Sequence, residues 1–251
     1  LACMYAYAEF LNKKGLNVNY KVIGTPRKEA RFVINTLSLK VEEHDEDYEQ
    51  IILVDASDKS SKGIPQELNV NKVIEIIDHR QNPKVKEDFP NAKIQIEFVG
   101  SCATLIAEKL LGENVEISEE SAILLYSAII WSTINFKNKV TTERDIKIAN
   151  WLKTKFTLPE NYIHNLFSYG SEVSIEELFF ANFESGKKKV GISQLETVEI
   201  EKYIHRKFSN TNVVNISSEP QAKSIVFTPS VFKIPDEKVD ENLVSVMMPF
   251  S

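Results

Sequence analysis

Two acidic side chains stand directly after hydrophobic segments that we expect to form β-strands. Asp55 follows residues 51–54, and Asp78, with His79 beside it, follows residues 74–77. In open parallel sheets, ligands bind just beyond the carboxyl ends of the strands. Carboxylate oxygen and imidazole nitrogen together suit Mn²⁺, with Mg²⁺ or another divalent metal such as Zn²⁺ as alternatives. We therefore expect Asp55, Asp78 and His79 to form a metal site.

A divalent metal at this position would permit phosphoryl chemistry, because it polarises a phosphoryl oxygen and lowers the pKa of a bound water. Arg80, the next residue, adds a permanent charge and a planar fork that matches phosphate oxygens. Each residue alone also has a structural interpretation. Either aspartate could be a helix N-cap, and His79 could be a hydrogen-bonded structural residue. Two acid-terminated strands in succession favour a metal or phosphate site.

The elements that must position these side chains alternate between strand and helix along the first 150 or so residues. Hydrophobic periodicity predicts strands at residues 18–23, 51–54, 73–77 and 94–99. It predicts helices at residues 1–15, 27–37, 101–111, 119–134 and 142–156. This alternation indicates an α/β fold with a parallel sheet sandwiched by helices, its strands buried on both faces.

The alternation of predicted strands and helices is interrupted between residues 153 and 169. We expect a first domain at 1–155, a linker at 156–170 and a smaller α/β domain at 171–251. In the second domain we expect a capping box at 174–177, strands at 189–195, 212–216 and 224–227, and a helix at 197–208.

Composition excludes several classes of protein. The chain is 43% hydrophobic and 26% charged, as in ordinary globular proteins. Its net charge of −6 argues against general nucleic-acid binding, which requires a basic surface. The apolar runs are far shorter than the ~20 residues that cross a bilayer, so we expect no membrane partner. Cys3 and Cys102 form no metal-binding or disulfide pattern, and a cytoplasmic location is expected.

Several motifs, in the same order along the chain, resemble those of the DHH phosphoesterase superfamily. They are Val54-Asp55, Asp78-His79-Arg80 and residues 99–106, which read Val-Gly-Ser-Cys-Ala-Thr-Leu-Ile. Arginine in the triplet resembles the prune-like exopolyphosphatase branch, whereas residues 24–33 resemble manganese-dependent family II inorganic pyrophosphatases. Residues 186–196 are similar to the signature strand of the DHHA2 domain that follows in both groups. The resemblance spans about residues 1–208.

The resemblance implies roles for five residues. Asp55 matches an aspartate that bridges two metals, and His79 matches a metal-binding histidine. Asp78 matches a position that either binds metal directly or supports the ligands. Arg80 stands at a phosphate-facing position, so Asp55, His79 and Arg80 are the expected catalytic residues. Lys189 matches a lysine that binds a substrate phosphate, although a solvated strand end is its alternative interpretation.

Three departures from the family pattern bear on activity. The opening motif, a histidine followed by Asp-x-Asp, does not precede Leu1. The sequence begins with helical periodicity, so we expect upstream residues to be missing. Ser132 stands where the family has an aspartate in its fourth motif. The tail, residues 243–250, has no basic residue where the family has Ser-Arg-Lys-Lys.

The expected function is metal-dependent hydrolysis of a phosphoanhydride, either inorganic pyrophosphate or short-chain polyphosphate, with Mn²⁺ as the cofactor. The partner is then a small phosphate-containing substrate, and the resemblance also implies homodimers. The alternative is a catalytically impaired relative that binds a phosphorylated ligand or a protein partner. A third possibility is phosphodiesterase activity on nanoRNA or cyclic dinucleotides. The Gly-Gly-His run of those relatives does not occur in the sequence.

Overall fold

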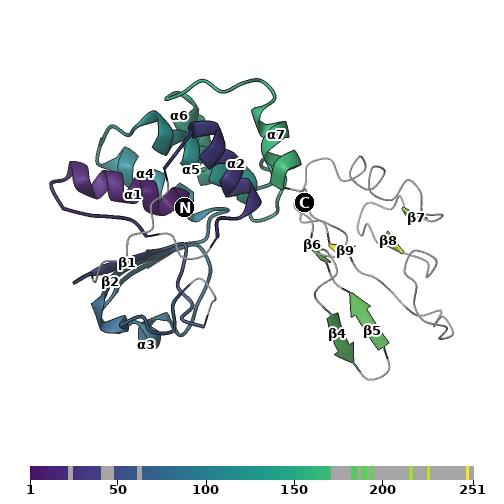
Figure 1. The fold of residues 1–251 in the computed structure, drawn as a ribbon, viewed down its shortest axis with the longest axis horizontal. Helices are drawn as coiled ribbons and strands as arrows, with labels where there is room; N and C mark the ends of the chain where they lie inside the picture. Colours follow the sequence, from purple (N-terminus) through teal and green to yellow (C-terminus); the bar gives the residue numbers. More distant parts are fainter. Residues whose placement is uncertain are drawn as a thin grey trace. The chain divides into compact units, whose positions relative to one another are not determined.

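The computed structural model describes residues 1–21, 25–40, 48–60 and 64–170, and the backbone of short strands between residues 182 and 248. The chain divides into two compact units, Leu1–Tyr169 and Gly170–Ser251. The first unit (Figure 1) contains, in chain order, α1 (Ala2–Lys13), α2 (Lys28–Leu37), β1 (Ile51–Val54), a 3₁₀ turn (Val70–Lys72), β2 (Val73–Asp78), α3 (Val85–Asp88), β3 (Lys93–Ile96), α4 (Cys102–Gly112), α5 (Glu119–Ser132), α6 (Glu143–Lys153) and α7 (Tyr162–Gly170).

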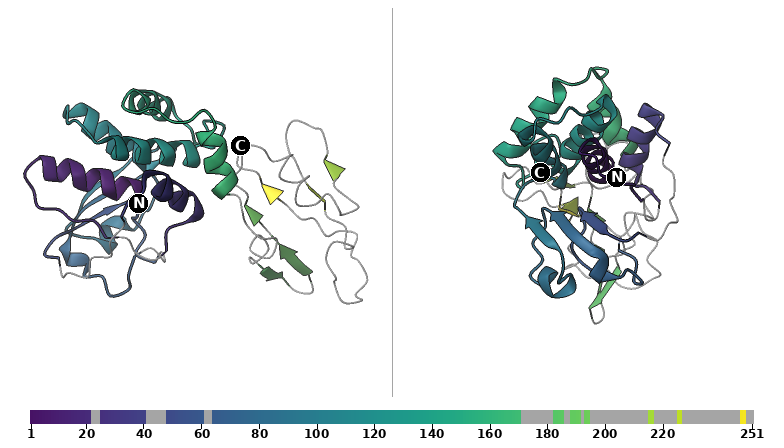
Figure 2. Two further views of the ribbon diagram at one scale, coloured as in Figure 1. Left: turned by 45° about the horizontal axis from the view of Figure 1, so that its top comes forward. Right: turned by 90° about the vertical axis from the view of Figure 1, so that its left-hand side faces the viewer.

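Strands β1, β2 and β3 form a parallel sheet in that order. Helices α1 and α4 lie on one side of the sheet and α3 on the other (Figures 1 and 2). The α1 side is tied to β2 by the Tyr7 hydroxyl, which donates to Glu75 Oε2 at 2.8 Å. The opposite side carries a hydrophobic cluster of Ile64, Val73, Ile76, Val85 and Phe89. The sheet is therefore covered on both faces, which confirms the expected α/β class.

Local side chains cap the first turns of three helices that follow the sheet, α4, α5 and α6. Ser101 and Ser118 cap α4 and α5, since each hydroxyl accepts a hydrogen bond from a backbone N–H of the first turn. Thr142 and Asp145 form a reciprocal capping box at α6. Helix α5 is apolar along most of its length and is packed against α1, α4 and α6, as a helix buried on several sides must be.

The expected strand at residues 18–23 is wrong for the part that the structure describes. Val18 exchanges two hydrogen bonds of 2.8 Å with the side chain of Asn12, so its backbone groups are satisfied by a loop contact. Residues 22 and 23 lie outside the described residues.

Two other expectations, on strands β3 and β1, also change. Strand β3 ends at Ile96, before residue 99. The residues of β1 are only half-buried, because β1 lies at the edge of the described sheet.

Helix α7 occupies the second half of the stretch expected to be a linker. Tyr162, Leu166 and Phe167 are buried, and Phe167 stacks on Trp131 of α5 with 5.0 Å between ring centroids. These contacts place α7 with the first unit. The domain boundaries drawn from the sequence stay a prediction.

The second unit contains short paired strands: β4 (Asn182–Ser185), β5 (Lys188–Gly191), β6 (Ser193–Gln194), β7 (Asn215–Ile216), β8 (Ile225–Val226) and β9 (Met247–Met248). Strands β4 and β5 are antiparallel, as are β7 and β8, whereas β6 and β9 are parallel. The expected capping box at 174–177 and helix at 197–208 lie outside the described residues. Among the described residues, no helix is long and apolar enough to cross a membrane.

Candidate metal centre

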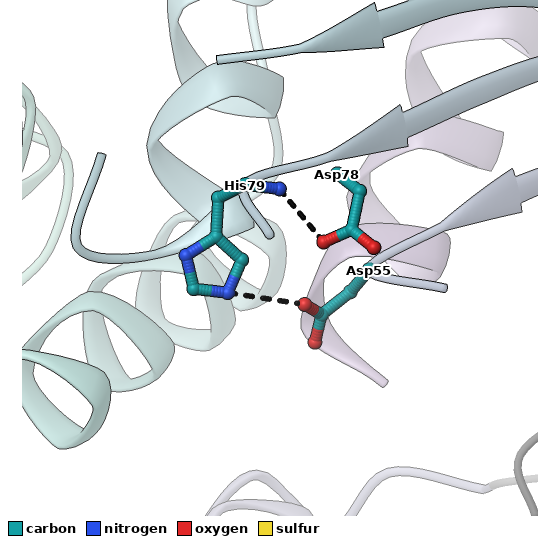
Figure 3. A group of neighbouring side chains, drawn as sticks. All are labelled: Asp55, Asp78 and His79. Carbon is teal, nitrogen blue, oxygen red and sulfur yellow. Dashed lines mark hydrogen bonds and ion pairs between the residues drawn. The ribbon is translucent and has the colours of Figure 1, made fainter. Parts of the chain in front are cut away.

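The carboxyl ends of β1 and β2 bring Asp55, Asp78 and His79 together (Figure 3). The register pairs Val54 with Ile77, and Asp55 N–H donates to the Ile77 carbonyl at 2.8 Å. Each aspartate therefore leaves its strand at the same edge of the sheet. One ligand atom from each of the three side chains lies within 4.8 Å of the other two.

The His79 ring is held by a backbone carbonyl on one side, so that its other nitrogen faces the Asp55 carboxylate. Its Nδ1 lies 3.0 Å from the Val99 carbonyl, and its Nε2 lies 3.5 Å from Asp55 Oδ1. Since a carbonyl can only accept, Nδ1 carries the proton of the neutral ring and Nε2 keeps its lone pair. A carbonyl behind the imidazole is the usual support of a metal-ligating histidine.

Asp78 combines the two interpretations that its sequence context allows. It is 2% exposed, and its Oδ1 accepts from the backbone N–H of His79 at 2.7 Å and of Arg80 at 3.2 Å. These bonds cap the turn that follows β2. The carboxylate still faces the cluster, and it can contribute to a metal site while it orders the turn that carries His79 (Figure 3).

Asp55 is the most exposed member of the cluster, with 47% of its side chain accessible. Its backbone is left-handed, with φ 58°, a conformation that aspartate tolerates better than most residues. Desolvation by surrounding atoms opposes its charge, but His79 and Arg80 together lower the pKa of Asp55. Burial likewise opposes protonation of His79, whereas Asp55 and the Val99 carbonyl raise the pKa of the imidazole.

Arg80 reaches across to both aspartates. Its Nη2 lies 2.5 Å from Asp55 Oδ1 and 3.2 Å from the Asp55 carbonyl, and its Nε lies 3.6 Å from Asp78 Oδ1. The Arg80 side chain as a whole is nevertheless 62% exposed, so it can be approached from solvent. The structure thus brings four of the five expected site residues together.

The donor set fits a divalent metal. Two carboxylates and one imidazole are ligands that Mn²⁺ and neighbouring first-row ions accept, and three protein ligands leave coordination positions open. The residues that would hold the ion are Asp55, Asp78 and His79.

Two sequence-predicted positions remain outside the cluster. Position 189 lies in β5 of the second unit, and the side chain of Lys189 is not described. Ser132 is the last residue of α5, where its carbonyl accepts from Asn138 Nδ2 at 3.3 Å. Three left-handed residues follow it closely, Ile134, Asn135 and Phe136. The left-handed conformation of Ile134 is strained, because a β-branched side chain rarely adopts it.

Asp145, which was not among the residues expected from the sequence, supports the turn behind His79. This carboxylate is fully buried and accepts from Gly100 N–H at 2.9 Å and from the Thr104 hydroxyl at 2.5 Å. It thereby holds the turn next to Val99, whose carbonyl orients His79. The Thr-x-x-Asp spacing at residues 142–145 was the available signal, because it is typical of a capping box.

The fold and the centre define the chain as an α/β protein with a candidate divalent-metal site at the carboxyl ends of parallel strands. Comparison with known proteins narrows this class. The chain is 30% identical over 206 residues to the "Probable manganese-dependent inorganic pyrophosphatase" of Clostridium acetobutylicum, a match that covers 78% of this chain and 66% of the relative. It is 30% identical over 207 residues to the manganese-dependent inorganic pyrophosphatase of Bacillus subtilis, with the same two coverages.

A cobalt-dependent inorganic pyrophosphatase of Clostridium perfringens is 30% identical over 162 residues, which are 62% of this chain and 29% of the relative. A crystal structure of a Methanococcus jannaschii protein, provisionally assigned to family II inorganic pyrophosphatases, superposes with a TM-score of 0.57 at 26% identity. That match covers 83% of this chain and 76% of the other. A search of protein-family models found no match. The chain belongs to the family of manganese-dependent (family II) inorganic pyrophosphatases, which confirms the resemblance seen in its motifs.

Proposed function

We propose that the protein hydrolyses a phosphoanhydride, inorganic pyrophosphate or short-chain polyphosphate, with a divalent metal as cofactor. The observation that carries the proposal is the cluster of Asp55, Asp78 and His79 in a chain of this family. Mn²⁺ is the first choice of metal because manganese-dependent relatives match the chain, and the cobalt-dependent relative supports a site that accepts other divalent ions. The chain spans 66% of the length of the Clostridium acetobutylicum and Bacillus subtilis relatives.

Each residue has a separate task in this proposal. Asp55, Asp78 and His79 hold the metal, and the Val99 carbonyl fixes the direction of the imidazole. A bound divalent ion supplies Lewis acidity and lowers the pKa of water, which is the chemistry that hydrolysis of a phosphoanhydride needs. Arg80 binds phosphate oxygens with its exposed guanidinium.

Lys189 remains a proposed phosphate ligand on the evidence of its sequence motif. A small phosphate-containing substrate, a homodimeric assembly and a cytoplasmic location also remain proposals. The cytoplasmic location is supported by Cys3 and Cys102, which are buried free thiols, the state expected in a reducing compartment.

The test is phosphate release from pyrophosphate and tripolyphosphate in the presence of Mn²⁺. Asp55→Asn removes a metal ligand and should bring release down to background. Asp58→Asn is the matched control, since this exposed carboxylate lies three positions away and accepts from Ser60 N–H at 2.9 Å. No release above buffer by the unmodified protein, across several metals and at high protein concentration, contradicts the proposal.

A second candidate is a catalytically impaired relative that binds a phosphorylated ligand or a protein partner. The observation that favours it is Ser132, a neutral side chain at the position where the family's fourth motif has a carboxylate. Calorimetric titration with Mn²⁺ separates the two candidates. Two tight sites contradict impaired metal binding, whereas no binding favours it.

A further inference from the structure

One oxygen in the metal centre has two competing uses. Asp55 Oδ1 lies 2.5 Å from Arg80 Nη2 and 3.5 Å from His79 Nε2. A divalent ion held by Asp55 and His79 would need this same carboxylate. That position brings a divalent charge close to the guanidinium, and like charges at such a separation repel strongly.

The exposure of Arg80 leaves its side chain room to turn. Its contacts with the cluster come from Nη2 and Nε, whereas 62% of the side chain is open to solvent. The backbone N–H of Arg80 is held separately by Asp78 Oδ1 at 3.2 Å. The guanidinium can therefore turn away from Asp55 while the turn that carries His79 stays in place.

We propose that Arg80 is an exchange group: it leaves Asp55 when a divalent metal binds, and the released guanidinium then binds a phosphate of the substrate. This inference rests on the proposed function for the identity of the site. It adds an order of events, in which the metal binds first and frees the phosphate-binding arginine. It also implies that Arg80 weakens metal binding when phosphate is absent.

The decisive measurement is the affinity for Mn²⁺ alone, by calorimetry in phosphate-free buffer. Replacing Arg80 with alanine removes the competitor, and the dissociation constant for Mn²⁺ should fall by about tenfold, equivalent to about 1.4 kcal/mol. Arg144→Ala is the charge-matched control. Its guanidinium pairs with Glu108 and Glu97, so its loss should leave the Mn²⁺ affinity within about twofold of the original.

A second measurement uses inorganic phosphate in the presence of a chelator. Asp55→Asn takes away the carboxylate that holds the guanidinium and should raise phosphate affinity several-fold, whereas Asp58→Asn, with the same charge change, should not. The double variant Asp55→Asn, Arg80→Ala should lose the gain. This arm requires no metal, and its comparison of Asp55→Asn with Asp58→Asn stays informative if Arg80→Ala folds poorly.

The outcomes separate the inference from the proposed function. Unchanged or weaker Mn²⁺ binding by a folded Arg80→Ala overturns the exchange, even if the protein hydrolyses pyrophosphate. The exchange is also overturned if the double variant keeps the raised phosphate affinity of Asp55→Asn. It is overturned as well if neither the unmodified protein nor Arg80→Ala binds Mn²⁺. Tighter Mn²⁺ binding by Arg80→Ala, in a protein that releases no phosphate, upholds the exchange and refutes the proposed hydrolysis.

Discussion

Gly100→Ala is the substitution whose effect can be worked out most directly from the structure. A Cβ added at Gly100 would lie 2.7 Å from Thr133 Cγ2 and 3.0 Å from Asp145 Oδ2. Neither neighbour can move freely: Thr133 and Asp145 are both fully buried, and Asp145 already accepts from Gly100 N–H and from Thr104. The turn must shift instead, and the Val99 carbonyl behind His79 shifts with it.

The expected magnitudes follow from these contacts. Overpacking a tight site costs about 1–3 kcal/mol, which for a protein of this size lowers Tm by about 2–4 °C per kcal/mol. Loss of the support behind a metal-ligating histidine weakens metal binding by about 10- to 100-fold. Gly100→Ala should therefore lower Tm and raise the dissociation constant for Mn²⁺ together.

Thermal unfolding and Mn²⁺ titration measure the two effects on one preparation. Gly112→Ala is the matched control, because a Cβ there meets nothing within 4 Å at the end of α4. Alanine at a helical position should leave stability unchanged or raise it by up to about 1 kcal/mol. A Gly100→Ala protein with unaltered Tm and unaltered Mn²⁺ affinity refutes the reasoning about the turn.

Three further changes test other parts of the unit. Burial opposes the charge of Glu9, but Lys13 and the capped start of α5 lower the pKa of this carboxyl. Its contribution to stability is then present above the ordinary value of 4.5 and lost as pH falls through the lowered pKa. Glu9→Gln should lower the free energy of unfolding by about 1–2 kcal/mol at pH 7, and its Tm should converge with that of the unmodified protein in acid. A difference in Tm that stays constant at all pH values contradicts this prediction. Tyr162→Phe removes the 2.7 Å hydrogen bond to Ser127 and should cost about 1 kcal/mol in denaturant unfolding, with an unchanged midpoint as the opposing result. Ser132→Asp restores a carboxylate at the end of α5 and should strengthen Mn²⁺ binding or phosphate release, and no gain in either shows that this position is not what limits the site.

Much of the centre could be predicted because its residues follow from local patterns. The apolar run 51–54 forms a strand by composition, and the acid after it must leave the sheet at the carboxyl end. The same holds for Asp78 at the end of β2. The structure pairs β1 with β2 in parallel, and this register brings the two acids together at one edge of the sheet.

Other parts could not be predicted, because they depend on neighbours far away in the chain. Residues 18–21 look like a strand by composition, yet a strand requires a partner, and Val18 bonds to the side chain of Asn12 instead. Tyr162, Leu166 and Phe167 were placed in a linker, since nothing local shows that α2 and α5 offer aromatic partners to α7.

The amino-acid sequence by itself determined the α/β class, the family motifs and the identity of the candidate metal ligands, because strand composition, helix caps and strand-end acids act over a few residues. Only the tertiary structure decided how those ligands are held. The Val99 carbonyl behind His79, the buried Asp145 under Gly100 and the guanidinium of Arg80 on Asp55 all join residues that lie 20 or more positions apart. Contacts of this kind arise when the chain packs, and they decide which ring nitrogen faces the centre and which cation shares its carboxylate.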